Sequence, residues 1–173
     1  MRKVVVIGTT GSGKTTLAGR LSRRTGFRVI ELDQLYWGRD WQPATVELFR
    51  HRVEREIKDD DWIVVGNYGQ VRDLVWRPAD TLVWLDLPLS VVMWRLFWRT
   101  LRRVLSKEEL WASGNRESWR TSFLSRQSIL VWAWKTHRRN RQRFARECLS
   151  HGEHKRIVRL TSKRDVERFV DAA

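Results

Sequence analysis

The sequence lacks several features that would point to particular classes of protein. It contains one cysteine in 173 residues, Cys148, which excludes an internal disulfide framework and fits a reducing cytoplasm. No apolar run approaches the roughly 20 residues that span a bilayer, and the first apolar stretch is too short for a signal peptide. There is also no low-complexity linker and no internal repeat. We therefore expect a single cytoplasmic domain over residues 1–173, without a membrane partner.

Acidic residues are scarce relative to basic ones, and the imbalance lies in the second half of the chain. The formal net charge is +14. Residues 1–86 hold 14 Lys and Arg against 12 Asp and Glu, whereas residues 87–173 hold 20 against 8. Such an excess favours polyanionic partners, which include nucleotide phosphates, nucleic acid and acidic surfaces. The alternative is a solvated basic face.

Five short runs rich in Val and Ile are continuous rather than alternating, as in strands buried on both faces. These runs are Lys3–Gly8, Arg28–Leu32, Trp62–Gly66, Thr81–Leu87 and Arg156–Leu160. Segments of helical period separate them: Lys14–Arg24, Ala44–Lys58, Gln70–Trp76, Leu89–Leu105, a long one within Arg120–Leu149, and Arg164–Ala172. The alternation predicts an α/β fold with a five-stranded parallel sheet and helices on both faces. A break in the periodicity at about residues 105–120 predicts a small helical lid.

The stretch GTTGSGKTT follows the first apolar run and fits G-x-x-x-x-G-K-[ST] at every position. Glycines allow positive φ and bring backbone N–H groups close to a phosphate, and the following helix aims its first amides at the same anion. The motif predicts that Lys14 reaches the β- and γ-phosphates of a nucleoside triphosphate and that Thr15 binds Mg²⁺. The predicted nucleotide-binding residues are Gly8, Thr9, Thr10, Gly11, Ser12, Gly13, Lys14, Thr15 and Thr16.

A P-loop in so short a chain leaves little room for the extra strands of motors, helicases or AAA-type ATPases, and no NKxD-type guanine motif is present. The chain resembles the adenylate-kinase-like P-loop kinases and, more specifically, small bacterial proteins described as DNA topology modulation protein (FlaR-type). The matching segments are GTTGSGKTT, ELDQLYWGRDWQP, WIVVGNYG, and VWLDLP with the arginine-rich helix after it. The resemblance implies a three-layer P-loop kinase fold and phosphoryl transfer from ATP with Mg²⁺.

The resemblance also implies two catalytic arginines. In adenylate kinases the fourth strand ends in a D-x-P turn, and the next helix carries arginines seven and eleven residues past the proline. Here the turn is Asp86-Leu87-Pro88, so the same offsets reach Arg95 and Arg99. A helical wheel independently places them, with Arg102 and Arg103, opposite an apolar arc of Trp94, Phe97, Trp98, Leu101, Val104 and Leu105. A face of arginines without carboxylates suits a clamp on phosphates during transfer, and a solvated face is the alternative.

The long helix within Arg120–Leu149 supplies a second pair of arginines. Its predicted apolar arc holds Phe123, Leu130, Val131, Trp134 and Cys148. Arg138 and Arg141 project into that arc, where an unpaired charge is costly and needs an anionic partner. The resembling family also uses arginines from the helix after its lid, so we predict that both act in the site. The alternative is a helix that breaks near His137.

Asp33 lies just past the second predicted strand, at the carboxyl edge where an α/β sheet binds its ligands. In related kinases of hydroxyl groups, an aspartate there receives the acceptor proton or helps hold the metal, and we predict such a role for Asp33. The neighbouring Tyr36, Trp37 and Trp41 suit the wall of a site for a base, a sugar or a ring.

The third predicted strand departs from the family pattern. Where adenylate kinases read D-G-F-P-R, this chain has Val65 in place of the metal-organising aspartate and Gln70 in place of the arginine that grips AMP. We therefore do not expect adenylate kinase activity, and we assign the metal to Thr15 together with Asp33 or Asp86. A carboxylate introduced at position 65 should be tolerated if the strand end is wet.

The 11 tryptophans divide into two groups. Trp62, Trp84, Trp94 and Trp98 are predicted to lie in the core. Trp37, Trp41, Trp111 and Trp119 fall in loops or the lid, where they could stack on bases or be buried when the lid closes.

Taken together, these features predict an ATP-dependent phosphotransferase that moves the γ-phosphoryl group to a small acceptor, with nucleosides and nucleotides among the candidates. The alternative is a nucleic-acid-binding NTPase or a polynucleotide-end kinase that affects DNA topology. The basic second half favours the alternative, whereas arginines that point inward favour the first interpretation.

Overall fold

A computed structural model describes residues 1–106, 109–110, 115–116, 129–151 and 155–173 of the chain. Five parallel strands form its central sheet in the order β2-β3-β1-β4-β7. The strands are β1 (Lys3–Gly8), β2 (Arg28–Glu31), β3 (Trp62–Val65), β4 (Thr81–Leu85) and β7 (Arg156–Leu160). The predicted five-stranded parallel sheet is therefore confirmed, and three strands end one or two residues earlier than predicted.

The predicted helices are all present. They are α1 (Lys14–Thr25), α3 (Val46–Glu56), α4 (Arg72–Trp76), α5 (Leu89–Ser106), α6 (Ile129–His151) and α7 (Lys163–Asp171). The sequence did not reveal a short helix α2 (Leu32–Tyr36) or the 3₁₀ turns η1 (Arg39–Trp41) and η2 (Gly69–Val71). In the part of the chain that the structure describes, no helix is both long enough and apolar enough to cross a membrane.

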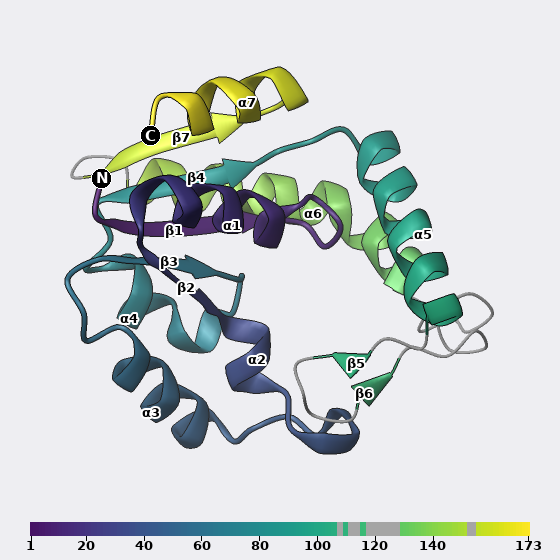
Figure 1. Cartoon of the computed structure of the whole chain (residues 1–173), viewed down its shortest axis with the longest axis horizontal. Helices are drawn as coiled ribbons and strands as arrows, with labels where there is room; N and C mark the ends of the chain where they lie inside the picture. The colour runs from purple at the N-terminus through teal and green to yellow at the C-terminus, as the bar shows by residue number, and fades with distance from the viewer. Residues whose placement is uncertain (107–108, 111–114, 117–128, 152–154) are drawn as a thin grey trace.

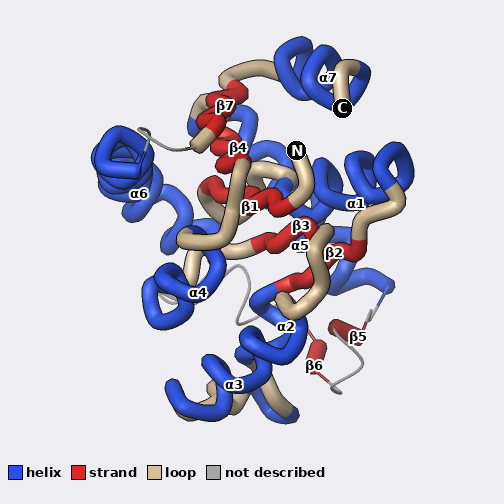
Figure 2. Tube along the Cα trace, turned by 90° about the vertical axis from the view of Figure 1, so that its left-hand side faces the viewer, coloured by secondary structure: helices blue, strands red, loops and turns tan. Residues whose placement is uncertain are grey.

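Alternate side chains of each strand enter two separate cores, one on each face of the sheet. In β1, Val5 and Ile7 pack with α3, α4 and α6, whereas Val4 and Val6 pack with α1 and α7. Figure 2 shows the helices in these two layers on either side of the strands. Burial on both faces explains why the strand sequences are continuously apolar.

The P-loop and Asp33 follow the carboxyl ends of β1 and β2, which lie at the same end of the parallel sheet. The loop from β1 to α1 leaves this end in the direction of α5, which belongs to neither core (Figure 1). Because α5 lies beyond the sheet, only part of its surface meets the rest of the domain.

The predicted helical lid is wrong in part. Within its segment the described residues beyond α5 form two short antiparallel strands, β5 (Glu109–Leu110) and β6 (Asn115–Arg116). Two-residue strands leave no periodicity for sequence analysis to detect. Trp111 and Trp119 lie outside the described residues.

Candidate active site

The β1–α1 loop has the backbone of a phosphate-binding loop. Gly11 and Gly13 have φ of 77° and 95°, a region that residues with a Cβ rarely adopt. A Cβ at Gly11 would lie 3.1 Å from Leu96 Cβ, so α5 packs directly against the loop. Gly13 is the N-cap of α1, and the N-terminal amides of that helix follow it. The loop is therefore shaped to surround an anion with N–H groups.

The Lys14 side chain folds back onto the loop. Its Nζ donates to the carbonyl oxygens of Gly8 at 2.9 Å and Thr9 at 3.0 Å. Burial lowers the pKa of Lys14 to about 8, the Asp33 carboxylate opposes this shift, and the Arg99 guanidinium adds to it. These electrostatic contacts bring Asp33 and Arg99 to the same side of the P-loop as Lys14.

The two arginines predicted on α5 both approach the P-loop. Arg95 Nη1 donates to the Ser12 carbonyl at 3.1 Å, and a Cβ at Gly13 would lie 3.3 Å from the same nitrogen. Arg99 is half-buried and lies near enough to Lys14 to lower the pKa of its ammonium. Their placement beside the loop agrees with the sequence, and their roles toward phosphate remain predictions.

The predicted buried face of α5 is wrong. Its buried row is Val92, Leu96 and Thr100, whereas Trp94 is 64% exposed and Trp98 49% exposed. Phe97 and Leu105 are also exposed. The wheel assumed that the apolar arc of a helix meets the core, but α5 lies beyond the end of the sheet and exposes Trp94, Phe97, Trp98 and Leu105. Trp62 and Trp84, in contrast, are buried as predicted.

Asp33 sits in the first turn of α2, immediately after β2. Tyr68, which follows β3, donates its hydroxyl to Asp33 Oδ1 at 2.6 Å. Burial, the charge of Asp33 and this hydrogen bond together raise the pKa of Tyr68, so the phenol stays protonated. The rings of Tyr36 and Tyr68 lie 4.7 Å apart, and the ring of Trp37 packs edge-on against Tyr36. An aromatic wall therefore stands next to the Asp33 carboxylate.

Asn67 was missed by sequence reasoning. Its Oδ1 accepts from the Gly8 N–H at 3.3 Å, and its Nδ2 donates to the Gly8 carbonyl. The two residues are 59 positions apart, so no local motif could have revealed the contact. The sequence signal for Asn67 was its position alone, just after the buried strand β3, which pairs with β1.

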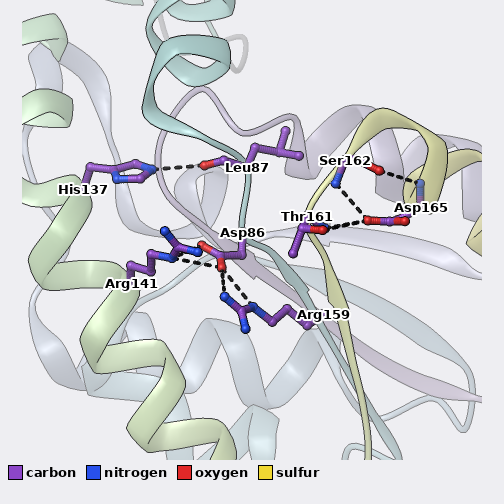
Figure 3. Close-up of polar contacts among 8 residues, drawn as sticks. All are labelled: Asp86, Leu87, His137, Arg141, Arg159, Thr161, Ser162 and Asp165. Carbon is purple, nitrogen blue, oxygen red and sulfur yellow. Dashed lines mark hydrogen bonds and ion pairs between the residues drawn. The ribbon is translucent and has the colours of Figure 1, made fainter.

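The surroundings of Asp86 do not suit the metal-binding role that the sequence predicted for it. Its side chain is 3% exposed, and its Oδ2 accepts from Arg141 Nε at 3.1 Å and from Arg159 Nε at 2.9 Å (Figure 3). One turn before Arg141 in α6, His137 Nε2 donates to the Leu87 carbonyl at 3.1 Å. These contacts fasten α6 and β7 to the end of β4. Two guanidinium groups already neutralise Asp86, which leaves Asp33 as the metal candidate.

The predicted buried face of α6 is confirmed at Cys148 and wrong at Trp134, and the helix does not break near His137. The buried residues of α6 are Ala133, Thr136, His137, Asn140, Phe144 and Cys148. Trp134 is 63% exposed, Arg138 is exposed, and the Arg141 side chain is 51% exposed while it pairs with Asp86. Polar residues occupy part of the buried stripe, so a wheel of apolar residues gave the wrong phase. Phe123 lies outside the described residues.

Arg50 and Arg72 are paired with carboxylates, whereas Arg52 donates to the Leu35 carbonyl at 2.8 Å. Arg50 bonds to both oxygens of Asp73, at 2.8 and 2.7 Å, and Arg72 pairs with Glu147 at 2.7 Å. Within the described residues, no group of three or more His, Cys, Asp or Glu could hold a metal ion by itself. A magnesium ion that arrives with a nucleotide does not require such a group, because phosphates and water fill most of its coordination sphere.

Val65 is buried. The strand end is therefore not exposed to water, as it would have to be for a carboxylate at position 65 to be tolerated. Val65 is 5% exposed and packs with Leu17 and Ala18 of α1. Thr15 and Thr16, in the first turn of α1, are exposed.

The fold and the loop define the class of protein: this is a P-loop domain with the architecture of the P-loop kinases. Residues 4–83, from β1 to β4, match a protein family described as "AAA domain". Shikimate kinase of Persephonella marina is 25% identical over 149 residues, which cover 77% of this chain and 86% of that protein. Shikimate kinase 2, chloroplastic, of Oryza sativa is 26% identical over 110 residues, which cover 55% of this chain and 36% of that protein.

Two solved structures have the same fold along nearly the whole chain. An unliganded sugar kinase from Janibacter sp. HTCC2649 has a TM-score of 0.52 and 19% identity, covering 99% of this chain and 91% of its own. Shikimate kinase from Bacteroides thetaiotaomicron has a TM-score of 0.54 and 16% identity, covering 98% and 94%. These similarities support a P-loop kinase and do not confirm the narrower resemblance to DNA topology modulation proteins.

Proposed function

We propose that the protein transfers the γ-phosphoryl group of ATP to a hydroxyl group of a small acceptor. The observation that carries this proposal is the P-loop at the carboxyl end of β1, with Asp33 following the carboxyl end of β2 in the same parallel sheet. A phosphate-binding loop and a carboxylate capable of receiving a proton thus lie at one end of the sheet. The kinases similar to this chain support the same reaction class.

The donor side of the reaction would use the P-loop and α5. The loop amides and Lys14 would hold the β- and γ-phosphates, and Arg95 and Arg99 would stabilise the charge that develops during transfer. Arg95 would then exchange the Ser12 carbonyl for phosphate oxygens. Arg141 is left out of this set because it pairs with Asp86, and Arg138 because it is exposed.

The acceptor side would use Asp33. The acceptor oxygen would bond to the γ-phosphorus while the bond from that phosphorus to the β,γ-bridging oxygen breaks, and Asp33 would take the hydroxyl proton. Mg²⁺ bound with ATP would neutralise phosphate charge, and Thr15 and Asp33 are the residues that would hold it. The exposed position of Thr15 beside the loop fits this role.

We infer that the acceptor is a hydroxylated ring that carries no phosphate, rather than a nucleotide. The aromatic wall of Tyr36, Trp37 and Tyr68 offers a stacking surface. Arg50 and Arg72 are engaged by Asp73 and Glu147, so neither is placed to bind an acceptor phosphate. Shikimate and sugars, which appear in the names of the similar kinases, are both hydroxylated rings.

The test is acceptor-dependent ADP release with a panel of shikimate-like cyclic alcohols, sugars, nucleosides, nucleotides and short oligonucleotides. We expect a cyclic alcohol or sugar without a phosphate to stimulate release, and Lys14→Ala to abolish it. Stimulation by a nucleoside monophosphate alone would overturn the acceptor class. Stimulation by oligonucleotides alone, with strong loss between low and moderate salt, would instead support the nucleic-acid alternative. No stimulation by any compound, with ATP still bound, would contradict the kinase.

A further inference from the structure

The Gly8 carbonyl accepts hydrogen bonds from two side chains at once. One donor is Lys14 Nζ at 2.9 Å, and the other is Asn67 Nδ2. Asn67 also accepts from the N–H of Gly8 at 3.3 Å, so its amide pairs with both polar groups of one residue. Asn67 therefore fixes the point where β1 becomes the P-loop.

Lys14 Nζ has three N–H groups and donates two of them to the Gly8 and Thr9 carbonyls, so a nucleotide that accepts more than one of these donors draws the ammonium away from a carbonyl. Gly8 and Thr9 are both buried, and a buried carbonyl that loses its partner is costly. Each carbonyl, however, has a second donor. Asn67 remains on the Gly8 oxygen, and the Ser12 N–H remains on the Thr9 oxygen at 3.2 Å. The loop can thus release Lys14 without leaving an unpaired acceptor behind.

The next residue makes the corresponding contact on the acceptor side. Tyr68 holds Asp33 Oδ1 at 2.6 Å, so Oδ2 is the oxygen that can turn to an acceptor hydroxyl. The end of β3 is pressed against α2, because a Cβ at Gly66 would lie 2.8 Å from Leu32 Cβ. This close packing fixes the Asn67–Tyr68 pair between the P-loop and Asp33.

We propose that Asn67 and Tyr68 are positioning residues that link the two halves of the site. Asn67 keeps the Gly8 carbonyl bonded when Lys14 turns to the nucleotide, and Tyr68 orients the base. The pair occupies the strand end where the resembling family has its metal-organising aspartate, which Val65 replaces here. The role of Tyr68 rests on the proposed phosphoryl transfer, whereas the role of Asn67 requires only ATP binding.

The Asn67 arm is tested by the dissociation constant of ATP, measured by calorimetry without an acceptor. Asn67→Leu removes the amide at similar size, and Asn67→Asp keeps the shape but cannot donate to the Gly8 carbonyl. We expect both to weaken ATP binding by about tenfold or more, the value of a lost hydrogen bond to a buried acceptor. The matched control is Thr81→Val, which removes the hydrogen bond from Thr81 to Asp80 at the opposite end of the sheet and should leave ATP binding unchanged. Wild-type affinity in either Asn67 variant would overturn the donor role.

The Tyr68 arm is tested by separating binding from turnover. Tyr68→Phe should lower kcat by about tenfold while the dissociation constant of ATP stays that of the wild type. The rate is measured with the active acceptor, or with water as acceptor in slow ATP hydrolysis. A loss of thermal stability with unchanged kcat would reduce Tyr68 to a packing residue. Absence of any acceptor would count against the proposed function alone, because the Asn67 arm is decided without one.

Discussion

Arg95 of α5 donates a hydrogen bond to the Ser12 carbonyl in the middle of the P-loop. The same helix packs Leu96 against Gly11, so α5 contacts the loop through both a cation and an apolar side chain. A loop carbonyl is a weak substitute for a phosphate as a partner of guanidinium. A bound nucleotide is therefore expected to take Arg95 from Ser12, and α5 is positioned to respond to the occupancy of the loop.

The first prediction concerns Arg95 and Arg99. Each Arg→Ala change should lower kcat by about 10²-fold and change KM for ATP much less, because the charge acts mainly in the transition state. Steady-state kinetics with the active acceptor measure both constants. Arg102→Ala is the matched control, since Arg102 is exposed on the same helix. Equal kinetics for all three variants would assign the arginines of α5 to the solvated face.

The second prediction uses the depressed pKa of Lys14. Burial lowers this pKa to about 8, so the ammonium is charged below that pH and loses its proton above it. Phosphates favour the charged form, so ATP binding should take up about one proton near pH 9 and very little near pH 7. Calorimetry in buffers of different ionisation enthalpy measures this uptake. Lys14→Arg should show none at either pH, because a guanidinium stays charged. Equal uptake in the variant and the wild type would place the titrating group elsewhere.

The strands and the P-loop could be predicted from the sequence because local patterns determine them. Val5 and Val6 enter different cores, so β1 had to be apolar throughout, and the glycines of the loop follow it directly. The contacts of Asn67 with Gly8 and of Asp86 with Arg141 could not be predicted. Each joins residues more than fifty positions apart, and their geometry depends on the packed sheet.

The face of α5 and part of the face of α6 were predicted wrongly for a physical reason. A helical wheel identifies where apolar residues gather but not which side of the helix the domain covers. Trp94 and Trp98 gather on the outward side of α5, and the buried stripe of α6 includes His137 and Asn140. Hydrophobicity failed at α5 because that helix packs on the P-loop and on α6 rather than on a face of the sheet.

The third prediction separates a structural from a metal-binding role for Asp86. Asp86→Asn keeps the shape but loses the charge between Arg141 and Arg159. Because both guanidinium groups are about half exposed and can rehydrate, we expect a loss of about 1–3 kcal/mol in the free energy of unfolding. Urea denaturation measures the loss, and Asp73→Asn, at an exposed ion pair with Arg50, should cost much less. If Asp86→Asn has normal stability but loses Mg²⁺-dependent turnover, Asp86 is a metal ligand and not a structural residue.

The fourth prediction concerns Val65, which stands where the resembling kinases have a carboxylate. Val65 packs against Leu17 and Ala18 in a core closed by α1, so Val65→Asp should destabilise the protein by about 3–5 kcal/mol at pH 8. Val65→Ala, which only removes methyl groups, should cost about 2 kcal/mol. Burial would raise the pKa of the introduced carboxyl above its unfolded value, so its charged form is penalised in the fold. The penalty is then complete above the folded pKa and shrinks as pH falls through it. Urea denaturation at pH 8 and pH 5 should therefore show a smaller loss at pH 5 for Val65→Asp and no such difference for Val65→Ala. Equal, pH-independent losses in the two variants would mean that water reaches this strand end, and a metal-organising carboxylate could then be restored without cost to the fold.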